Sequence, residues 1–221
     1  MTSEKIIDIL KNGKIHLSCE LFPPKQGVEL QNSLEIVNQI AASKPSYMSV
    51  TYGAGGSTVG YSAALAKKVE DNGMPALAHL TCVKADEAKL AEVLGQLQGF
   101  GVKNILALRG DIPADMQGEE IGSFAHASEL MRFVKQQGDF CVGGAAYPEG
   151  HPESGSLEQD IENTKYKVDA GVDFLVTQMF FDNTILYNYM FRLLRAGINV
   201  PVVPGIMPVT NAKQIIRICQ L

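Results

Sequence analysis

Residues 157–178, with the sequence LEQDIENTKYKVDAGVDFLVTQ, contain the pattern that decides the fold. Four side chains recur at the spacing of one helix face: Leu157, Ile161, Thr164 and Val168. This spacing predicts an amphipathic helix, and the Ala-Gly pair at 170–171 is a typical helix stop. Residues 174–178 follow as a short apolar strand. A helix that leads straight into a strand is typical of a parallel sheet with right-handed crossovers.

The same alternation of strand and helix repeats along the chain. Seven candidate strands span residues 15–21, 47–51, 76–81, 104–108, 140–145, 174–178 and 202–205. An eight-stranded barrel and an open doubly wound sheet both fit this alternation. Polar residues follow almost every strand and would form a ring, whereas a doubly wound sheet gathers them at one switch point. We therefore expect an α/β fold of the (β/α)8 TIM-barrel class.

The length of the chain limits the number of strand–helix units. The chain has 221 residues, and a typical α/β barrel has about 250. Seven units can be counted, and the last residues continue a helical pattern without a stop signal. We expect a single catalytic barrel domain over residues 1–221, truncated after the seventh unit, with the eighth strand and helix missing from this chain.

Composition excludes several classes of protein. Apolar residues make up 46% of the chain, which is enough to fill a core, and no apolar run approaches the ~20 residues of a membrane span. The net charge of −5 argues against nucleic acid and anionic membranes as partners. The four cysteines are widely spaced, which predicts free thiols in a reducing, cytoplasmic compartment.

The first candidate strand places an acid on its inner face. Strand alternation puts Ile15, Leu17, Cys19 and Leu21 toward the helices, and His16, Ser18, Glu20 and Phe22 toward the barrel interior. A carboxyl group in a dry site has a raised pKa and can act as a general acid near neutral pH. The alternative is a buried acid that is paired with a neighbouring side chain.

Other strand ends carry further candidates, each with an ordinary structural alternative. Arg109 can hold a phosphate with both arms of its guanidinium, and Asp111 can bind the amine edge of a heterocycle or simply form a turn. His79 fits a hydrogen-bonded core position better than a metal ligand. Gln178 is expected to face inward, as a buried amide with a ligand that both donates and accepts. Residues 160, 163 and 167 form a polar helix stripe that a solvated face explains equally well.

The joint pattern is more informative than any single residue. Six candidates fall at the carboxyl ends of strands: Glu20, Thr51, His79, Asp111, Tyr147 and Gln178. Barrel enzymes build their active sites at this edge. No lysine lies at a strand end, which weakens a Schiff-base mechanism, and no metal-ligand spacing is present, so no metal site is expected.

Eight segments, in order along the chain, resemble the methylenetetrahydrofolate reductase family. They are SCELFPP (18–24), SVTYGA (49–54), HLTC (79–82), ALRGD (107–111), AYPE with HPE (146–153), KVDAG (167–171), TQMFFD (177–182) and PGIMP (204–208). The resemblance, closest to the bacterial type, implies a flavin-dependent barrel that reduces 5,10-methylenetetrahydrofolate to 5-methyltetrahydrofolate with NADH or NADPH, a reaction that supplies methionine synthesis. It also implies FAD as cofactor, folate and NAD(P)H as substrates, and a homo-oligomer.

The resemblance also implies roles for individual residues. Glu20 matches the general acid that protonates the folate N10, and Asp111 matches the acid near the flavin and the pterin. Thr51, Gln178 and Gln214 match further contacts with substrate. The implied contacts with FAD are Tyr52, Ala54, His79, Arg109, Gly110, Asp111, His126, Ala127, Tyr147, His151, Ser154, Asp160, Asn163, Tyr166 and Lys167. The alternative is a truncated barrel or subunit that binds flavin or folate without catalysis.

Overall fold

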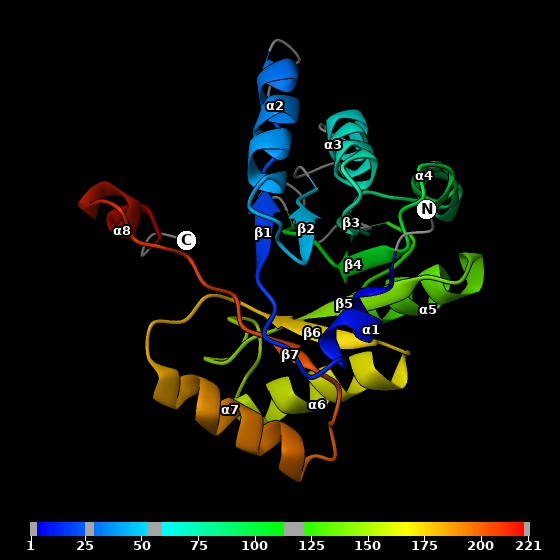
Figure 1. Cartoon of the computed structure of the whole chain (residues 1–221). Coiled ribbons are helices and arrows are strands. Elements are labelled where there is room, and N and C mark those ends of the chain that lie inside the picture. The colour runs from blue at the N-terminus through cyan, green and yellow to red at the C-terminus, as the bar shows by residue number, and fades with distance from the viewer. Residues whose placement is uncertain (1–3, 25–28, 53–58, 113–121, 219–221) are drawn as a thin grey trace.

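The computed structural model describes residues 4–24, 29–52, 59–112 and 122–218. Seven parallel strands form one curved sheet in chain order (Figure 1). The strands are β1 (Ser18–Leu21), β2 (Tyr47–Val50), β3 (Ala76–Thr81), β4 (Asn104–Leu108), β5 (Cys141–Ala146), β6 (Phe174–Thr177) and β7 (Val202–Val203). Consecutive order confirms the barrel-type arrangement, because a doubly wound sheet reverses its order at a switch point. The sheet is open between β7 and β1 in the described part of the chain.

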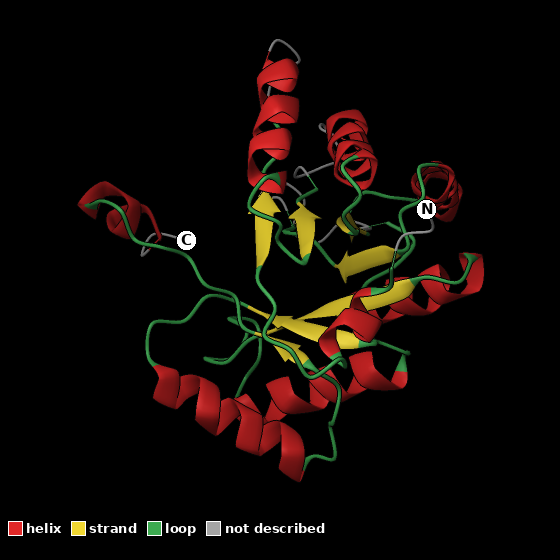
Figure 2. Cartoon of the chain, in the orientation of Figure 1, coloured by secondary structure: helices red, strands yellow, loops and turns green. Residues whose placement is uncertain are grey.

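Most of the helices cover the outer face of this sheet (Figure 2). The helices are α1 (Ile6–Leu10), α2 (Leu30–Ala41), α3 (Val59–Asp71), α4 (Glu87–Gly99), α5 (Ala127–Gln137), α6 (Leu157–Asp169), α7 (Asn183–Arg195) and α8 (Ala212–Ile218). Side-chain caps start three of them: Asp86 accepts from the Lys89 N–H, Ser156 from the Gln159 N–H and Asp182 from the Thr184 N–H. None of the described helices is long and apolar enough to cross a membrane.

The core has two layers, one on each face of the sheet. The outer layer joins the sheet to the helices through side chains such as Met48, Leu80 and Leu130. The inner layer lies inside the curve of the sheet and contains Phe174 together with Ile6, from the short helix α1. Helix α1 therefore closes the amino-terminal end of the barrel interior, and the carboxyl end of the strands is left for a site.

The first strand is shorter than the sequence pattern predicts. β1 begins at Ser18, and Ile15 and Leu17 are exposed rather than packed against the helices. Leu21 does lie in the outer core, so the alternation of faces holds within the strand itself. Phe22, expected inside the barrel, is 74% exposed. The prediction fails at these positions because β1 is an edge strand and pairs only with β2 in the described residues.

Asn104 fastens α1 to the sheet. Its side-chain oxygen accepts from the Ile6 N–H at 2.8 Å, and its amide group donates to the carbonyl oxygens of Glu4 at 3.2 Å and Ala76 at 3.3 Å. The side chain is fully buried. A buried polar group that loses its partner costs about 1–3 kcal/mol.

We expect Asn104→Ala to lower the free energy of unfolding by about 2–4 kcal/mol, because it leaves several backbone groups unpaired. The amide proton of Ile6 should also exchange faster with solvent. Urea unfolding and hydrogen exchange measure the two effects. Asn72→Ala, which removes an exposed amide, is the control and should change stability by less than about 0.5 kcal/mol. Equal effects of the two substitutions would contradict this account.

Candidate active site

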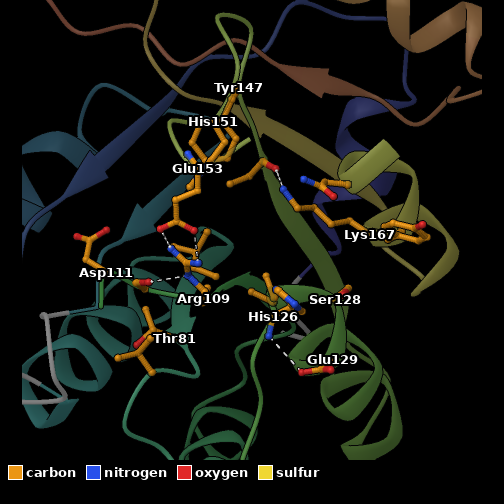
Figure 3. Close-up of a pocket in the computed structure, with 18 of the residues that line it drawn as sticks. Thr81, Arg109, Asp111, His126, Ser128, Glu129, Tyr147, His151, Glu153 and Lys167 are labelled. Atoms are coloured by element: carbon orange, nitrogen blue, oxygen red, sulfur yellow. Dashed lines mark hydrogen bonds and ion pairs between the residues drawn. The ribbon is translucent and has the colours of Figure 1, made fainter. Parts of the chain in front are cut away.

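A cavity of about 780 Å³ lies at the carboxyl ends of the strands (Figure 3). It is lined by strand ends from β2 to β5, by the first turns of α5 and by one face of α6. The structure brings these predicted site residues to its wall: Thr51, Tyr52, His79, Arg109, Gly110, Asp111, His126, Ala127, Tyr147, His151, Ser154, Asp160, Asn163, Tyr166 and Lys167. Ala54 lies outside the described residues. The size is in the range of cofactor sites.

Three of the residues that were matched to substrate contacts lie outside this cavity. Gln178 is exposed, and its side-chain oxygen accepts from the N–H of Met179, so the expectation of a buried amide is wrong. β6 ends at Thr177, and alternation no longer fixes the direction of the following side chain. Gln214 accepts from Thr210 within the segment that carries α8, which lies apart from the sheet (Figure 1).

Glu20, the third of these residues, is close to the cavity wall without forming part of it. It is an exposed residue of edge strand β1 and lies opposite Ser49 of β2. The hydroxyl of Ser49 in turn contacts His79, which lines the cavity. Partial desolvation raises the pKa of the Glu20 carboxyl. This carboxyl can therefore hold a proton closer to neutral pH than a free glutamate can.

Arg109 is paired within the protein. Its two terminal nitrogens donate to the two oxygens of Glu153, each at 2.6 Å, and its Nε donates to the carbonyl of Gly110 at 3.3 Å. The predicted two-armed grip on an anion is present, and its occupant is a carboxylate of the chain. Sequence reasoning missed Glu153, because nothing in the spacing connects it to a residue 44 positions earlier.

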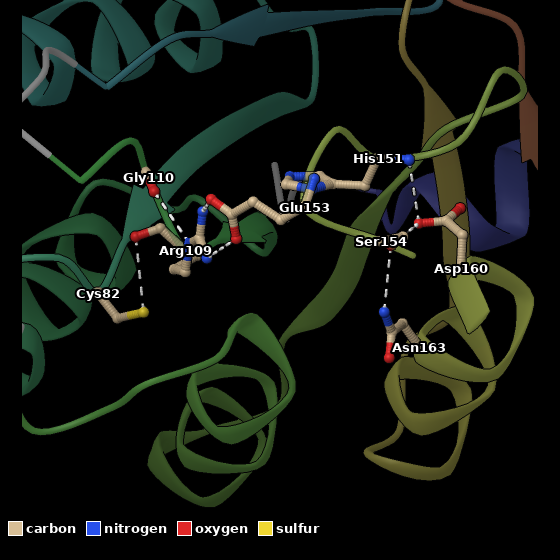
Figure 4. A network of polar contacts seen from close by, with 8 residues as sticks. All are labelled: Cys82, Arg109, Gly110, His151, Glu153, Ser154, Asp160 and Asn163. Carbon is tan, nitrogen blue, oxygen red and sulfur yellow. Dashed lines mark hydrogen bonds and ion pairs between the residues drawn. The ribbon is translucent and has the colours of Figure 1, made fainter. Parts of the chain in front are cut away.

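Asp160 organises the loop between β5 and α6 (Figure 4). Its Oδ1 accepts from the N–H of His151 at 3.3 Å and from the hydroxyl of Ser154 at 3.1 Å. Asn163 donates to the same hydroxyl at 3.4 Å. The side chain of Asp160 is buried, so a solvated helix face does not explain its place in the polar stripe of residues 160, 163 and 167. Oδ2 of Asp160 is buried and has no hydrogen-bond partner in the described part of the chain.

Lys167 adds a desolvated cation to the same wall. Its Nζ donates to the carbonyl of Ala145 at 2.7 Å and lies 5.4 Å from the centre of the Tyr147 ring. Tyr147 also meets the ring of His151 edge to face, at 4.6 Å between centres. Burial lowers the pKa of the Lys167 ammonium, and Asp160 opposes that shift. In the described part of the chain the one hydrogen bond of this partly buried cation goes to a neutral carbonyl, so its charge is available to an anionic ligand.

Other lining residues were not predicted from the sequence. They include Thr81, Ser128, Glu129, Arg132 and Glu153. Glu129 accepts from the N–H groups of Ala125 and His126, so it caps the start of α5 beside the cavity. A glutamate three residues after a helix start is the signal that could have located this cap. No group of three or more His, Cys, Asp or Glu residues is arranged to hold a metal ion within the described ranges.

His79 combines a core position with a place on the cavity wall. Its Nε2 lies 2.6 Å from the hydroxyl oxygen of Ser49, and the residue is 8% exposed. Burial lowers the pKa of His79 from 6.5 to about 4. The imidazole is therefore neutral at neutral pH, and it can offer one nitrogen to Ser49 and the other to a ligand.

The low pKa of His79 predicts a loss of stability in acid. Below pH 6.5 the unfolded chain binds a proton at this histidine and the folded chain does not, so the free energy of unfolding falls as the pH drops toward 4. The full effect is about 3 kcal/mol. We expect His79→Gln to lose about 2 kcal/mol less than the wild type between pH 7 and pH 4.5 in urea unfolding. His16→Gln, outside the cavity, is the control; an identical loss in all three proteins would contradict the assignment.

Comparison with known proteins adds evidence from sequence. A family model described as "Methylenetetrahydrofolate reductase" matches residues 5–221. The chain is 36% identical over 204 residues to the 5,10-methylenetetrahydrofolate reductase of Pectobacterium carotovorum subsp. carotovorum, covering 92% of this chain and 67% of that protein. It is 37% identical over 203 residues to the enzyme of the same name from Escherichia coli strain K12, covering 91% and 67%. The chain thus spans about two thirds of the length of these relatives.

Solved structures support the fold. A protein from Clostridium thermocellum, described as uncharacterized and as binding two copies of 5-methyl-5,6,7,8-tetrahydrofolic acid, matches with a TM-score of 0.66 and 13% identity. The match covers 97% of this chain and 74% of that one. A 2,3-dimethylmalate lyase matches with a TM-score of 0.62 and 12% identity, covering 96% and 76%. At these identities the likeness concerns the fold alone.

Proposed function

Because the chain belongs to the methylenetetrahydrofolate reductase family, we propose that it is an FAD-dependent enzyme that takes reducing equivalents from NADH or NADPH. Reduction of methylenetetrahydrofolate is the reaction that the named relatives support. Its proposed product, 5-methyltetrahydrofolate, would supply methionine synthesis. The cytoplasm is the proposed compartment, in keeping with the free thiols of Cys19, Cys82 and Cys141.

One observation carries the FAD proposal: a single cavity gathers all the described residues that were matched to FAD contacts, and they come from four strand ends and two helices. The cavity, at about 780 Å³, has room for a dinucleotide. The buried, unpartnered Oδ2 of Asp160 suits a hydroxyl donor such as that of a ribityl chain or a ribose. The residues present therefore fit FAD.

Charged and polar groups of the wall have distinct proposed tasks. Arg109 and Lys167 would bind the phosphates of FAD, and Asp160 would accept from a hydroxyl. Thr51 follows β2 and Asp111 follows β4, on either side of β3, and both line the cavity, where they would contact the folate and the flavin. FAD supplies the hydride-transfer chemistry when it is bound, and the protein supplies binding, orientation and a water-poor site.

Glu20 is the proposed general acid. It lies on β1, next to β2, whose end lines the cavity, so it would reach a folate bound between the cavity and the edge of the sheet. A carboxyl with a raised pKa keeps its proton for the folate N10, whose protonation opens the five-membered ring. Gln178 and Gln214 stay predictions as further contacts with the folate.

The predicted homo-oligomer also stays a proposal. Tyr187, Phe191 and Leu194 of α7 are all more than half exposed. Exposed apolar side chains of this size are common at interfaces between subunits. Light scattering on the purified chain measures the oligomeric state directly.

Product formation tests the proposed function. The purified chain is mixed with NADH or NADPH and methylenetetrahydrofolate, with and without added FAD, and 5-methyltetrahydrofolate is measured by chromatography. We expect product only where FAD and a nicotinamide donor are both present. Flavin binding without product would favour the non-catalytic alternative, and product formed equally well without any flavin would contradict the FAD proposal.

A further inference from the structure

Glu153 is hydrogen-bonded to the guanidinium of Arg109, the group that is proposed to bind the phosphates of FAD. Its two carboxylate oxygens accept from the two terminal nitrogens of Arg109 at 2.6 Å each, in the side-by-side geometry that a phosphate also adopts (Figure 4). The hydrogen bond to Arg109 lowers the pKa of the Glu153 carboxyl, so it is ionised at neutral pH. A phosphate and the Glu153 carboxylate are both negatively charged, and both would accept hydrogen bonds from the same two nitrogens of Arg109.

The charges along the wall make this conflict stronger. The described lining contains four carboxylates, at Asp111, Glu129, Glu153 and Asp160. It contains three basic side chains, at Arg109, Arg132 and Lys167. An ordinary dinucleotide brings about two further negative charges. Among these acids, Glu153 is the one that neutralises a cation of the wall by direct contact.

Arg109 and Glu153 differ in how exposed their side chains are and in how many other contacts hold them. Arg109 follows the end of β4 and is also tied to the carbonyl of Gly110, and its side chain is 23% exposed. Glu153 lies in the loop between β5 and α6, and its side chain is 58% exposed. The Glu153 side chain can therefore turn into solvent when it leaves the guanidinium, whereas the Arg109 side chain stays at the cavity wall.

We propose that Glu153 is an internal competitor for the phosphate-binding guanidinium of Arg109, and that it sets how tightly the site holds phosphate-bearing ligands. The inference rests on the proposed binding of FAD in this cavity. When a phosphate binds Arg109, the carboxylate of Glu153 turns out to solvent. Affinity for FAD is lower than the wall could otherwise provide, and binding and release of the cofactor become easier.

Glu153→Gln tests this competition, because it keeps the shape of the side chain and removes its charge. The control is Glu158→Gln, which breaks a surface pair with Arg192 at 2.8 Å and does not line the cavity. Dissociation constants are measured for the full chain with FAD and with riboflavin, which has no phosphate. We expect Glu153→Gln to bind FAD about tenfold more tightly than the wild type. The gain should shrink at high salt, and riboflavin binding should be unchanged.

If Glu153→Gln binds FAD equally or more weakly, Glu153 only positions Arg109 and the inference is wrong. An equal gain for riboflavin, or an equal gain in Glu158→Gln, would also overturn it. If the wild type binds no FAD at all, the proposed function is wrong, and this result does not by itself decide the role of Glu153. The same comparison with ADP, which carries the diphosphate alone, then still decides whether Glu153 competes with phosphate.

Discussion

Glu20→Gln is expected to lower the rate of methylenetetrahydrofolate reduction by about 10²–10⁴-fold, the usual effect of losing a general acid. Flavin reduction by the nicotinamide donor should keep its rate, because hydride delivery to the flavin requires no proton from this carboxyl. Stopped-flow measurements of the two half-reactions separate these effects. Glu35→Gln, on the exposed face of α2, is the control and should leave both rates unchanged.

The dependence on pH adds an independent check on Glu20. A general acid works in its protonated form, and desolvation raises the pKa of Glu20, so the folate half-reaction should slow as the pH rises through that pKa. Glu20→Gln should lack this decline. If both half-reactions fell together in the variant, Glu20 would have a structural role instead.

Lys167→Met should raise the dissociation constant of FAD by about 10–100-fold, because the variant keeps the length of the side chain and loses its partly buried charge. The hydrogen bond to Ala145 and the contact with the Tyr147 ring also disappear. Fluorescence titration with FAD measures the constant, and dilution of the loaded protein should release flavin from the variant first.

Lys165→Met is the matched control for this experiment. Lys165 lies on the same helix, two residues earlier, and is exposed. Its replacement should leave the dissociation constant within about twofold of the wild type, because exposed charges are well screened. An unchanged constant in Lys167→Met would show that this cation does not hold the cofactor.

The sequence predicted the order of elements because periodicity and helix stops are local signals. β3 and β4 match the expected ranges, and the parallel order follows from the strand–helix alternation. The exposure of Ile15, Leu17 and Phe22 was not predictable in the same way. Alternation within a strand says which side a residue faces, but not whether a neighbouring element is present on that side.

In the candidate site too, the features that depend on local spacing were predictable from the sequence, and those that depend on tertiary structure were not. Asp160 and Lys167 were placed on one polar helix face by spacing alone, and only the fold shows that this face lines the cavity and that Asp160 is buried there. The pairing of Arg109 with Glu153 joins the end of one strand to the loop after the next, so it depends on tertiary structure. For Gln178 the spacing gave the wrong direction, because β6 ends one residue earlier, at Thr177, and the side chain of Gln178 is exposed.

The most direct test of FAD-dependent folate reduction by this chain follows the visible absorbance of flavin in the full chain under anaerobic conditions. The protein is loaded with FAD, titrated with NADH or NADPH, and then mixed with methylenetetrahydrofolate. We expect the donor to bleach the flavin absorbance and the folate to restore it, with 5-methyltetrahydrofolate formed in equal amount. A chain that binds no FAD, or a bleached flavin whose absorbance the folate does not restore, would contradict it.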